Sequence, residues 1–311
     1  MHYDGMIYRP PFEARSLLLQ VTTGCSHNRC SFCTMYRDTA FHISPLEEVE
    51  ADLREAAPYA DRIHRVFLEG GDAFALSGER LITIAEMIHR YLPRTETIAM
   101  YASVNNIRTR SDADLARLHA LGIDELNIGV ESGDDAALAY LNKGYTAAEA
   151  ICQLKRLTDS GIRFGLNVIF GASGREGSEQ NALRTAELVN TAQPYLLFTG
   201  TIHADPGCPL YEDMQSGAFH ECTVREYLRE ERLFLASLRL KDCVYFGLHP
   251  ANIVPMQGHL PEDRELLLDY LDEAERQIAE DVLDAVPMRG DEGAVLICGT
   301  ARRSSSIAVT R

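Results

Sequence analysis

Short apolar runs and longer amphipathic segments alternate along the first two thirds of the chain. The apolar runs, each of strand length, lie at residues 16–23, 65–71, 97–104, 125–132, 164–171 and 195–203. Apolar residues recur with helical spacing between them, at 45–57, 79–92, 111–121, 134–142, 146–160 and 176–192. Near-continuous apolar strands separated by helices are typical of a parallel sheet that is buried on both faces. The pattern therefore predicts six βα units.

Six units are too few to close a TIM barrel, which needs eight, so we expect an α/β protein with a partial (β/α)6 TIM-like barrel. Two more helical patterns, at 223–240 and 262–284, follow the barrel. We assign the barrel to residues 1–215 and a helical C-terminal extension to 216–285. The remaining segment, 286–311, ends in the polar, serine-rich sequence ARRSSSIAVTR, and we expect this tail to be partly disordered.

Composition narrows the class of protein. The 311 residues are 46% apolar, which is enough for a sizeable core, but no apolar run approaches the roughly 20 residues that span a bilayer. The first residues, MHYDGMIYRPPFEARS, lack the blocks of a signal peptide, so we expect a cytoplasmic protein. A net charge of −16 argues against nucleic acid as a partner, because a broad nucleic-acid footprint needs a surplus of Lys and Arg.

Distinctive loops follow all six predicted strands. In parallel barrels the functional residues gather on the loops at the carboxyl ends of the strands. Here those loops contain, in chain order, GCSHNRCSFC, EGGD (69–72), Ser103 with Asn105, ESG (131–133), GASG (171–174) and His203 with Asp205. Gly and Ser punctuate most such turns, but the alignment of all six with a cysteine cluster predicts a functional site on this rim.

The first loop carries Cys25, Cys30 and Cys33 within nine residues. His27 offers a Cys3His zinc site as one alternative, although structural zinc sites usually come as two separated ligand pairs. Tight cysteine spacing in a reducing compartment suits an iron–sulfur cluster better. Three protein ligands on a four-iron cluster leave one iron open for a small molecule, which explains the missing fourth cysteine.

These residues resemble the radical SAM superfamily, whose three-cysteine loop follows the first strand of a partial barrel. The spacing here is C-x4-C-x2-C, one residue longer in its first gap than the common pattern, with Phe32 in the aromatic position. GGD at 70–72 resembles the GGE-type motif of that family. LGIDELNIGVESGDDAALAYLNKG, NVIFGASG and DPGCPLY resemble later segments of the subgroup with coproporphyrinogen oxidases, the Elongator catalytic subunit and methylthiotransferases.

The resemblance implies that Cys25, Cys30 and Cys33 ligate a [4Fe-4S] cluster and that S-adenosylmethionine (SAM) binds its open iron. Reductive cleavage of SAM would then give a 5′-deoxyadenosyl radical that abstracts hydrogen from substrate. The implied cofactor contacts are Phe32, Gly70, Gly71, Asp72, Glu131, Ser132, Ile169 and Gly171. We expect Glu131 to receive its donors from SAM, because a carboxylate at the end of a buried strand needs donors to stay charged.

Each contact also has a structural reading: Asp72 as a cap of the next turn, Ser132 as an N-cap, Ile169 as core. The residues Tyr36, Tyr101, Asn105, His203 and Asp205 are candidates for catalysis or substrate binding, weighed against ordinary structural hydrogen bonds. The scattered cysteines Cys208, Cys222, Cys243 and Cys298 show no paired spacing and read as small buried side chains.

The expected function is that of a radical SAM enzyme acting on a small molecule or peptide, with an electron donor such as flavodoxin or ferredoxin. The alternative is a carrier protein, binding the cluster, SAM or a tetrapyrrole without turnover. RNA modification is a third possibility, which the acidic charge disfavours. Met35 stands where the coproporphyrinogen oxidases have an extra cysteine, so the loop does not support haem biosynthesis.

Overall fold

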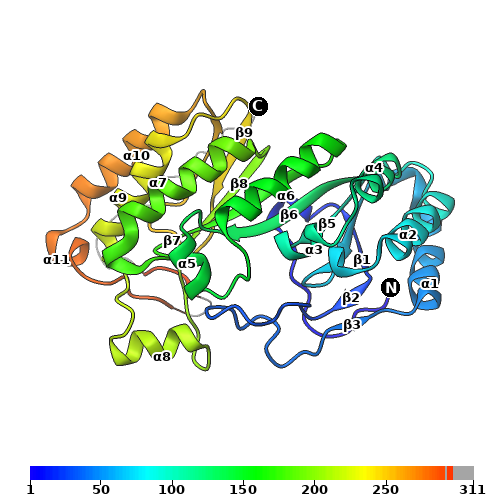
Figure 1. The fold of residues 1–311 in the computed structure, drawn as a ribbon, viewed down its shortest axis with the longest axis horizontal. Helices are drawn as coiled ribbons and strands as arrows, with labels where there is room; N and C mark the ends of the chain where they lie inside the picture. Colours follow the sequence, from blue (N-terminus) through cyan, green and yellow to red (C-terminus); the bar gives the residue numbers. More distant parts are fainter. Residues whose placement is uncertain (291–292, 297–311) are drawn as a thin grey trace. The chain divides into compact units, whose positions relative to one another are not determined.

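A computed structural model describes residues 1–290 and 293–296 of the chain (Figure 1). Its strands are β1 (Leu17–Gln20), β2 (Thr22–Thr23), β3 (His42–Ile43), β4 (Arg65–Glu69), β5 (Thr97–Ala102), β6 (Ile123–Glu131), β7 (Arg163–Phe170), β8 (Leu196–Thr201), β9 (Cys243–Gly247) and β10 (Met256–Leu260). Its helices are α1 (Leu46–Ala56), α2 (Gly78–Tyr91), α3 (Val104–Arg108), α4 (Asp112–Ala120), α5 (Asp135–Tyr140), α6 (Ala147–Ser160), α7 (Gly174–Ala192), α8 (Pro209–Ser216), α9 (Val224–Ser237), α10 (Arg264–Gln277) and α11 (Glu280–Leu283).

The main sheet has eight strands, mostly parallel, in the order β1-β4-β5-β6-β7-β8-β9-β10, and it is not closed. The chain folds as two compact units that interleave along the sequence. Unit 1 comprises residues 1–29, 35–129 and 152–165, and unit 2 comprises 30–34, 130–151 and 166–311. The boundary passes through the cysteine loop and through β6 and β7, so each unit is described separately below.

Unit 1 contains the parallel strands β1, β4, β5 and the first part of β6. The helices α1, α2 and α4 lie next to one another beside these strands (Figure 1). Each helix buries an apolar stripe, such as Leu81, Ile84 and Ile88 of α2, because these positions recur at helical spacing. Ser77 and Ser111 cap α2 and α4 by accepting a backbone N–H, which fixes where each helix begins.

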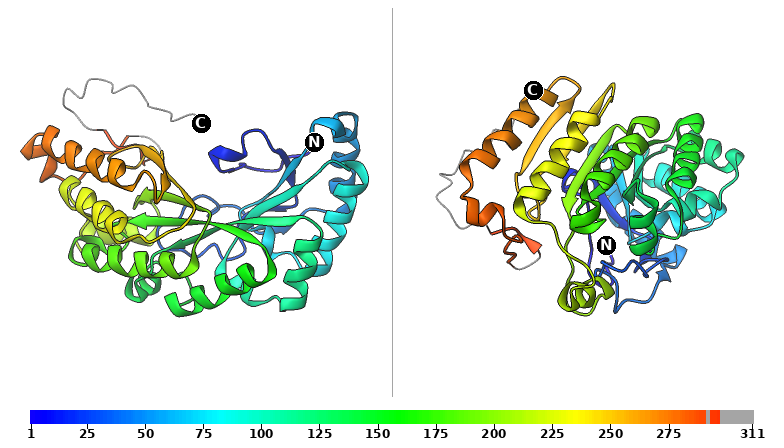
Figure 2. Two further views of the ribbon diagram at one scale, coloured as in Figure 1. Left: turned by 90° about the horizontal axis from the view of Figure 1, so that it is seen from above. Right: turned by 60° about the vertical axis from the view of Figure 1, so that its left-hand side comes forward.

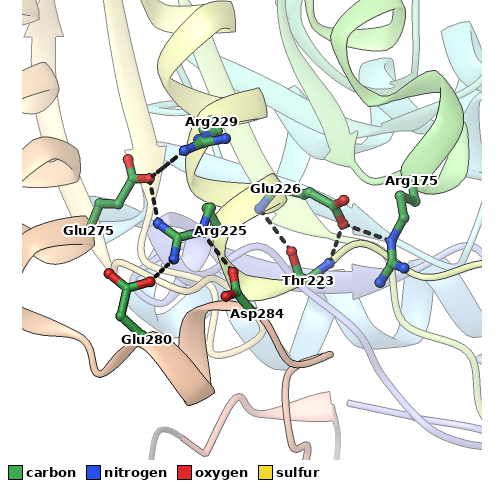
Figure 3. Close-up of polar contacts among 8 residues, drawn as sticks. All are labelled: Arg175, Thr223, Arg225, Glu226, Arg229, Glu275, Glu280 and Asp284. Carbon is green, nitrogen blue, oxygen red and sulfur yellow. Dashed lines mark hydrogen bonds and ion pairs between the residues drawn. The ribbon is translucent and has the colours of Figure 1, made fainter.

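Unit 2 contains β8, β9 and β10. Strand β8 runs parallel to β9, and β10 runs antiparallel to β9. Helices α7, α9 and α10 lie side by side against these strands (Figure 2). The amino-terminal end of α9 is a capping box, in which Thr223 and Glu226 satisfy each other's backbone N–H groups. Arg225, one residue before Glu226, reaches carboxylates of α10, α11 and the residue after α11 (Figure 3).

The predicted α/β partial barrel is confirmed, and all six predicted strands and the helices between them are present. Three strands were missed: the two-residue β3, and β9 and β10, which lie between the last helical patterns and lengthen the main sheet. The predicted 262–284 helix is two helices, α10 and α11. The domain boundaries predicted from the sequence stay a prediction. Most of the predicted disordered tail, residues 291–292 and 297–311, lies outside the described residues.

Candidate functional site

The cysteine loop leaves β2 and returns through β3, and the pairing of Thr22 with Ile43 closes its base. None of its three cysteines forms a disulfide with another described cysteine, and all three thiols are partly exposed. Cys25 belongs to unit 1, whereas Cys30 and Cys33 belong to unit 2. Within the described residues, no group of three or more His, Cys, Asp or Glu side chains is placed to hold a single metal ion.

The unit 2 part of this loop is anchored through Ser31, which is buried. The N–H of Ser31 donates to the carbonyl of Leu141 at 3.1 Å, and its hydroxyl donates to the carbonyl of Tyr140 at 3.0 Å. The carbonyl of Ser31 accepts the N–H of Leu210 at 3.0 Å. Three bonds on one residue hold the backbone between Cys30 and Cys33 in place, so this part of the loop is preformed.

In unit 1, Gly70 and Gly71 allow the chain to approach itself. Gly70 has φ +127°, and a β-carbon there would lie 2.5 Å from the carbonyl oxygen of Thr22. A β-carbon on Gly71 would lie 2.4 Å from the Tyr36 ring and 2.8 Å from the carbonyl oxygen of Gly24. Both glycines therefore serve packing against the start of the cysteine loop and against Tyr36. A contact with SAM at these glycines stays a prediction.

Asp72 connects the same loop to α3. One of its carboxylate oxygens accepts a hydrogen bond from the Ser26 hydroxyl, and the other accepts from Asn106 Nδ2 at 2.5 Å. Asp72 occupies the N-cap position of the following turn, Ala73–Ala75, but its side chain makes no capping hydrogen bond there. Because Ser26 directly follows Cys25, Asp72 orients the first cysteine's part of the loop.

In unit 2, Glu131 is paired with a lysine. Lys143 Nζ lies 3.1 Å from Glu131 Oε1, and the two side chains are only 12% and 11% exposed. Burial alone would lower the pKa of Lys143, but the Glu131 carboxylate beside it, with further electrostatic contributions from Tyr145 and Cys30, raises this pKa well above its usual value. Glu131 thus has a donor within the chain, contrary to the expectation that only SAM supplies one. Lys143 stands beside Cys30 and joins the candidate site.

A buried chain of hydrogen bonds links Ser132 to Gly171. The Ser132 hydroxyl donates to Asn181 Oδ1 at 2.5 Å, and Asn181 Nδ2 donates to Glu230 Oε1 at 2.6 Å. Glu230 Oε2 accepts the N–H of Gly171 at 2.9 Å. Burial raises the pKa of Glu230 to about 8. Ser132 is not the N-cap of α5, which is Asp134; it instead fixes the turn after β6.

The candidates His203 and Asp205 contact each other and the cysteine loop of unit 2. His203 Nε2 lies 2.8 Å from Asp205 Oδ1, and the hydroxyl of Thr34 donates to Asp205 Oδ2 at 2.8 Å. Although partial burial opposes it, these bonds lower the pKa of Asp205, so the carboxylate is stabilised. His203 also lines a cavity of about 490 Å³ together with Arg175, Tyr211 and Phe219.

The remaining predicted residues lie in both units. In unit 1, Tyr36 is buried with its ring edge against Tyr8, Tyr101 packs on Phe67, and Asn105 accepts a hydrogen bond from Arg108. In unit 2, Phe32 is partly exposed between the last two cysteines, and the carbonyl of Ile169 accepts from Asn181 Nδ2. Of the other cysteines, Cys208, Cys222 and Cys243 are buried as predicted, and Cys298 lies outside the described residues.

The family model of the radical SAM superfamily matches residues 19–187, more than half of the chain. The chain belongs to the radical SAM superfamily. The matched segment contains the cysteine loop, Gly70–Asp72, Glu131 and Lys143 described above. None of the described helices is long and apolar enough to cross a membrane.

Two curated relatives and one solved structure show which known proteins this chain is similar to. The heme chaperone HemW of Bacillus subtilis is 25% identical over 157 residues, covering 50% of this chain and 41% of the relative. The tRNA-2-methylthio-N(6)-dimethylallyladenosine synthase of Bordetella petrii is 27% identical over 213 residues, covering 64% and 43%. Both matches thus span less than half of the relative's length.

Among solved structures, the radical SAM methyltransferase TsrM from Kitasatospora setae, with cobalamin and a [4Fe-4S] cluster bound, has a TM-score of 0.53. It is 16% identical, and the match covers 65% of this chain and 37% of that one. At this identity the likeness concerns the fold. Family membership assigns the chain to proteins whose cofactors are a [4Fe-4S] cluster and SAM.

The residues present fit that cofactor pair. Cys25, Cys30 and Cys33 are unbridged, partly exposed thiols, the donor type that holds iron–sulfur clusters. Thiolates of a four-iron cluster bind different irons, so they need not converge on one point as the ligands of a single ion do. Lys143 supplies a positive charge beside Cys30, at a place where a thiolate-ligated cluster would add negative charge.

Lys143 and Glu230 were not predicted from the sequence. Lys143 is one of only three lysines among 30 basic residues, and it lies in a Gly-containing turn. The rarity of lysine in this chain could have drawn attention to Lys143, but the sequence does not reveal that its amine lies against Glu131. Glu230 follows the helical pattern of α9 at a position that faces the core, where a carboxylate is unexpected.

Proposed function

We propose that the protein is a radical SAM enzyme in which Cys25, Cys30 and Cys33 hold a [4Fe-4S] cluster with one open iron. When bound, cluster and SAM together supply a radical able to abstract hydrogen from an unreactive C–H bond. The substrate is a small molecule or peptide, and the reductant is a protein such as flavodoxin or ferredoxin. The observation that carries this proposal is the loop with three unbridged thiols in a chain of this superfamily.

The chain's own residues bind and orient. Ser31 and Thr34 hold the backbone around Cys30 and Cys33, and Asp72 holds Ser26 beside Cys25. We assign Lys143 and Glu131 to the methionine end of SAM, since an ammonium and a carboxylate side by side complement the carboxylate and amino group of an amino acid. Ser132, Ile169, Gly171 and Phe32 are assigned to its nucleoside end.

Metal content provides the first test. After anaerobic reconstitution, the protein should hold about four iron and four sulfide per chain and show a broad charge-transfer band. The triple Cys25/Cys30/Cys33→Ala variant should lose both. The matched control is Cys152→Ala, since Cys152 is an exposed cysteine outside the loop, and this variant should keep the cluster. A full cluster in the triple variant would refute the assignment.

Turnover provides the second test and separates the enzyme from a carrier. Reconstituted protein incubated with SAM and dithionite should form 5′-deoxyadenosine, and a metabolite extract should increase the amount. The relative HemW is a heme chaperone, so the alternative function is a tetrapyrrole carrier on the same scaffold. A protein that binds haem stoichiometrically but forms no 5′-deoxyadenosine would be such a carrier.

A further inference from the structure

Four polar side chains lie in one row across the strands of unit 1. Gln20 of β1 pairs with Glu69 of β4, and Tyr101 of β5 pairs with Asn127 of β6. Phe67 pairs with Ala99, so the residues two positions further along, Glu69 and Tyr101, are neighbours on the same face. We call Gln20, Glu69, Tyr101 and Asn127 the polar row. It lies at the carboxyl ends of β1, β4 and β5 and at the middle of the longer β6, on the side of the sheet edge where barrel enzymes bind their substrates.

The amino-terminal end of the same face is closed by charged residues that satisfy one another. Arg65 donates to both oxygens of Glu13, at 2.9 and 2.6 Å, and to Glu125 at 2.5 Å. Arg163 also donates to Glu125. Because Arg65 and Glu69 are four residues apart on one strand, this cluster lies roughly 13 Å from the polar row. The face is therefore sealed at one end by a complete network.

Two members of the polar row are left without hydrogen bonds of normal geometry to some of their side-chain atoms. Glu69 and Asn127 are 1% and 3% exposed, yet no described residue forms a hydrogen bond of normal geometry with either Glu69 oxygen or with Asn127 Nδ2. Gln20 differs, since its amide bonds both backbone groups of Asp4. Buried polar atoms in folded proteins are nearly always paired, so these require an explanation.

The charges that face Glu69 do not supply a partner. Burial raises the pKa of Glu69 to about 7, the N–H of Gly70 and the charge of Arg9 lower it, and Glu13 raises it. Arg9 is exposed, and its only described hydrogen bond goes to the carbonyl of Pro10 at 3.3 Å. A carboxylate in this position is best matched by a cationic donor, because charge-assisted hydrogen bonds are about twice as strong as neutral ones.

We propose that Glu69 and Asn127 recognise the substrate: Glu69 binds an aliphatic ammonium group, and Asn127 Nδ2 donates to a carbonyl or hydroxyl oxygen of the same molecule. The two residues lie two strand spacings apart, roughly 10 Å between α-carbons, so the ligand is an elongated amine with a separate acceptor. The net charge of −16 favours the approach of such a cation. This assignment rests on the proposed function, since the substrate is that of the same site.

The probe for this site is 4-aminobutanamide, which carries an ammonium group and an amide carbonyl, measured by calorimetric titration of the reconstituted protein. Wild type should bind it in the millimolar range, and butanamide, which lacks the amine, should bind at least tenfold more weakly. Glu69→Gln should weaken the probe by about tenfold or more, and Asn127→Leu by about three- to tenfold. Glu231→Gln, which alters a buried carboxylate of unit 2, should bind like wild type.

Background cleavage of SAM by dithionite on the same samples separates this inference from the proposed function. If the protein binds the probe in a way that depends on Glu69 but does not cleave SAM, the recognition site is supported and the proposal of a radical SAM enzyme is refuted. If the protein cleaves SAM but does not bind the probe, or if the Glu69→Gln variant binds the probe as tightly as wild type, the recognition site is refuted. A crystal structure with the probe that shows only ordered water at Glu69 and Asn127 would do the same.

Discussion

Two strands of the protein end in nearly the same four residues, and the two ends behave differently. β4 of unit 1 ends in EGGD at 69–72, and β6 ends, in unit 2, in ESGD at 131–134. Both glutamates are buried. Glu131 has Lys143 at 3.1 Å, whereas neither oxygen of Glu69 forms a hydrogen bond of normal geometry with a described residue.

The backbone differs as well. After β4 the positive φ falls on Gly70, where it costs little, whereas at β6 it falls on Glu131 itself, with φ +66°. A non-glycine residue keeps this conformation only when its surroundings hold it there, and the bond to Lys143 does so. One local sequence pattern therefore provides a fixed, paired carboxylate in unit 2 and a carboxylate without a cationic partner in unit 1.

The largest expected effect comes from removing the partner of Glu131. Lys143→Met leaves a buried carboxylate without a counter-charge and should lower the free energy of unfolding by about 3–5 kcal/mol, measured by urea denaturation of the cluster-free protein. The double variant with Glu131→Gln should recover part of the loss. The control is Lys155→Met, which breaks an exposed pair with Asp159 and should cost at most about 0.5 kcal/mol. Equal losses in the two lysine variants would contradict the comparison.

A smaller effect is expected on the pH dependence of the free energy of unfolding, through Glu69. The folded-state pKa of Glu69, about 7, lies above the ordinary value of 4.5, so the folded state binds the proton more tightly than the unfolded state. This contribution to stability is complete below about pH 4.5 and is lost as pH rises through 7, by up to about 3 kcal/mol. Unfolding free energies at pH 5 and pH 8 should therefore differ less in Glu69→Gln than in wild type. An unchanged difference would show that Glu69 is paired in solution.

The smallest effect concerns Glu69 at fixed pH. Glu69→Met removes a buried polar group and should leave the free energy of unfolding at pH 5, where the carboxyl is protonated in the folded state, unchanged or raise it by about 1 kcal/mol. Glu231 is the matched control, because it is equally buried but accepts a hydrogen bond from the Tyr245 hydroxyl. Glu231→Met should cost about 1–3 kcal/mol. A comparable loss in Glu69→Met would mean that unit 1 supplies a donor after all.

The fold was largely predictable from the sequence, and the reasons are visible in particular elements. Strand β5 is apolar apart from Thr97, and helices such as α2 repeat apolar residues at helical spacing, so the hydrophobic pattern alone located them. β10, MQGHL, carries one glycine and exposed polar residues, because it is an edge strand. Its pairing with β9 depends on contacts across the fold, which periodicity does not contain.

The candidate site was predictable in its chemistry but not in its pairing. The cysteine spacing and the glycine-rich strand ends identified the family, and Cys25, Cys30 and Cys33 are unbridged as an iron–sulfur site requires. The residue that neutralises Glu131 stands twelve positions later and reaches back through a turn. Glu69 was visible as an acidic residue in an apolar strand, but whether it is paired depends on the strands beside it.

The ion pairs of Arg225 in Figure 3 make the attachment of α11 within unit 2 sensitive to ionic strength. Arg225 holds Glu275, Glu280 and Asp284 together, and the latter two carboxylates are largely exposed. Val286 and Pro287, which line the cavity beside His203, follow directly along the chain. Salt screens exposed pairs but leaves buried apolar contacts almost untouched. High salt concentration should therefore weaken the attachment of α11 by its ion pairs, while the apolar packing of the sheet is unaffected.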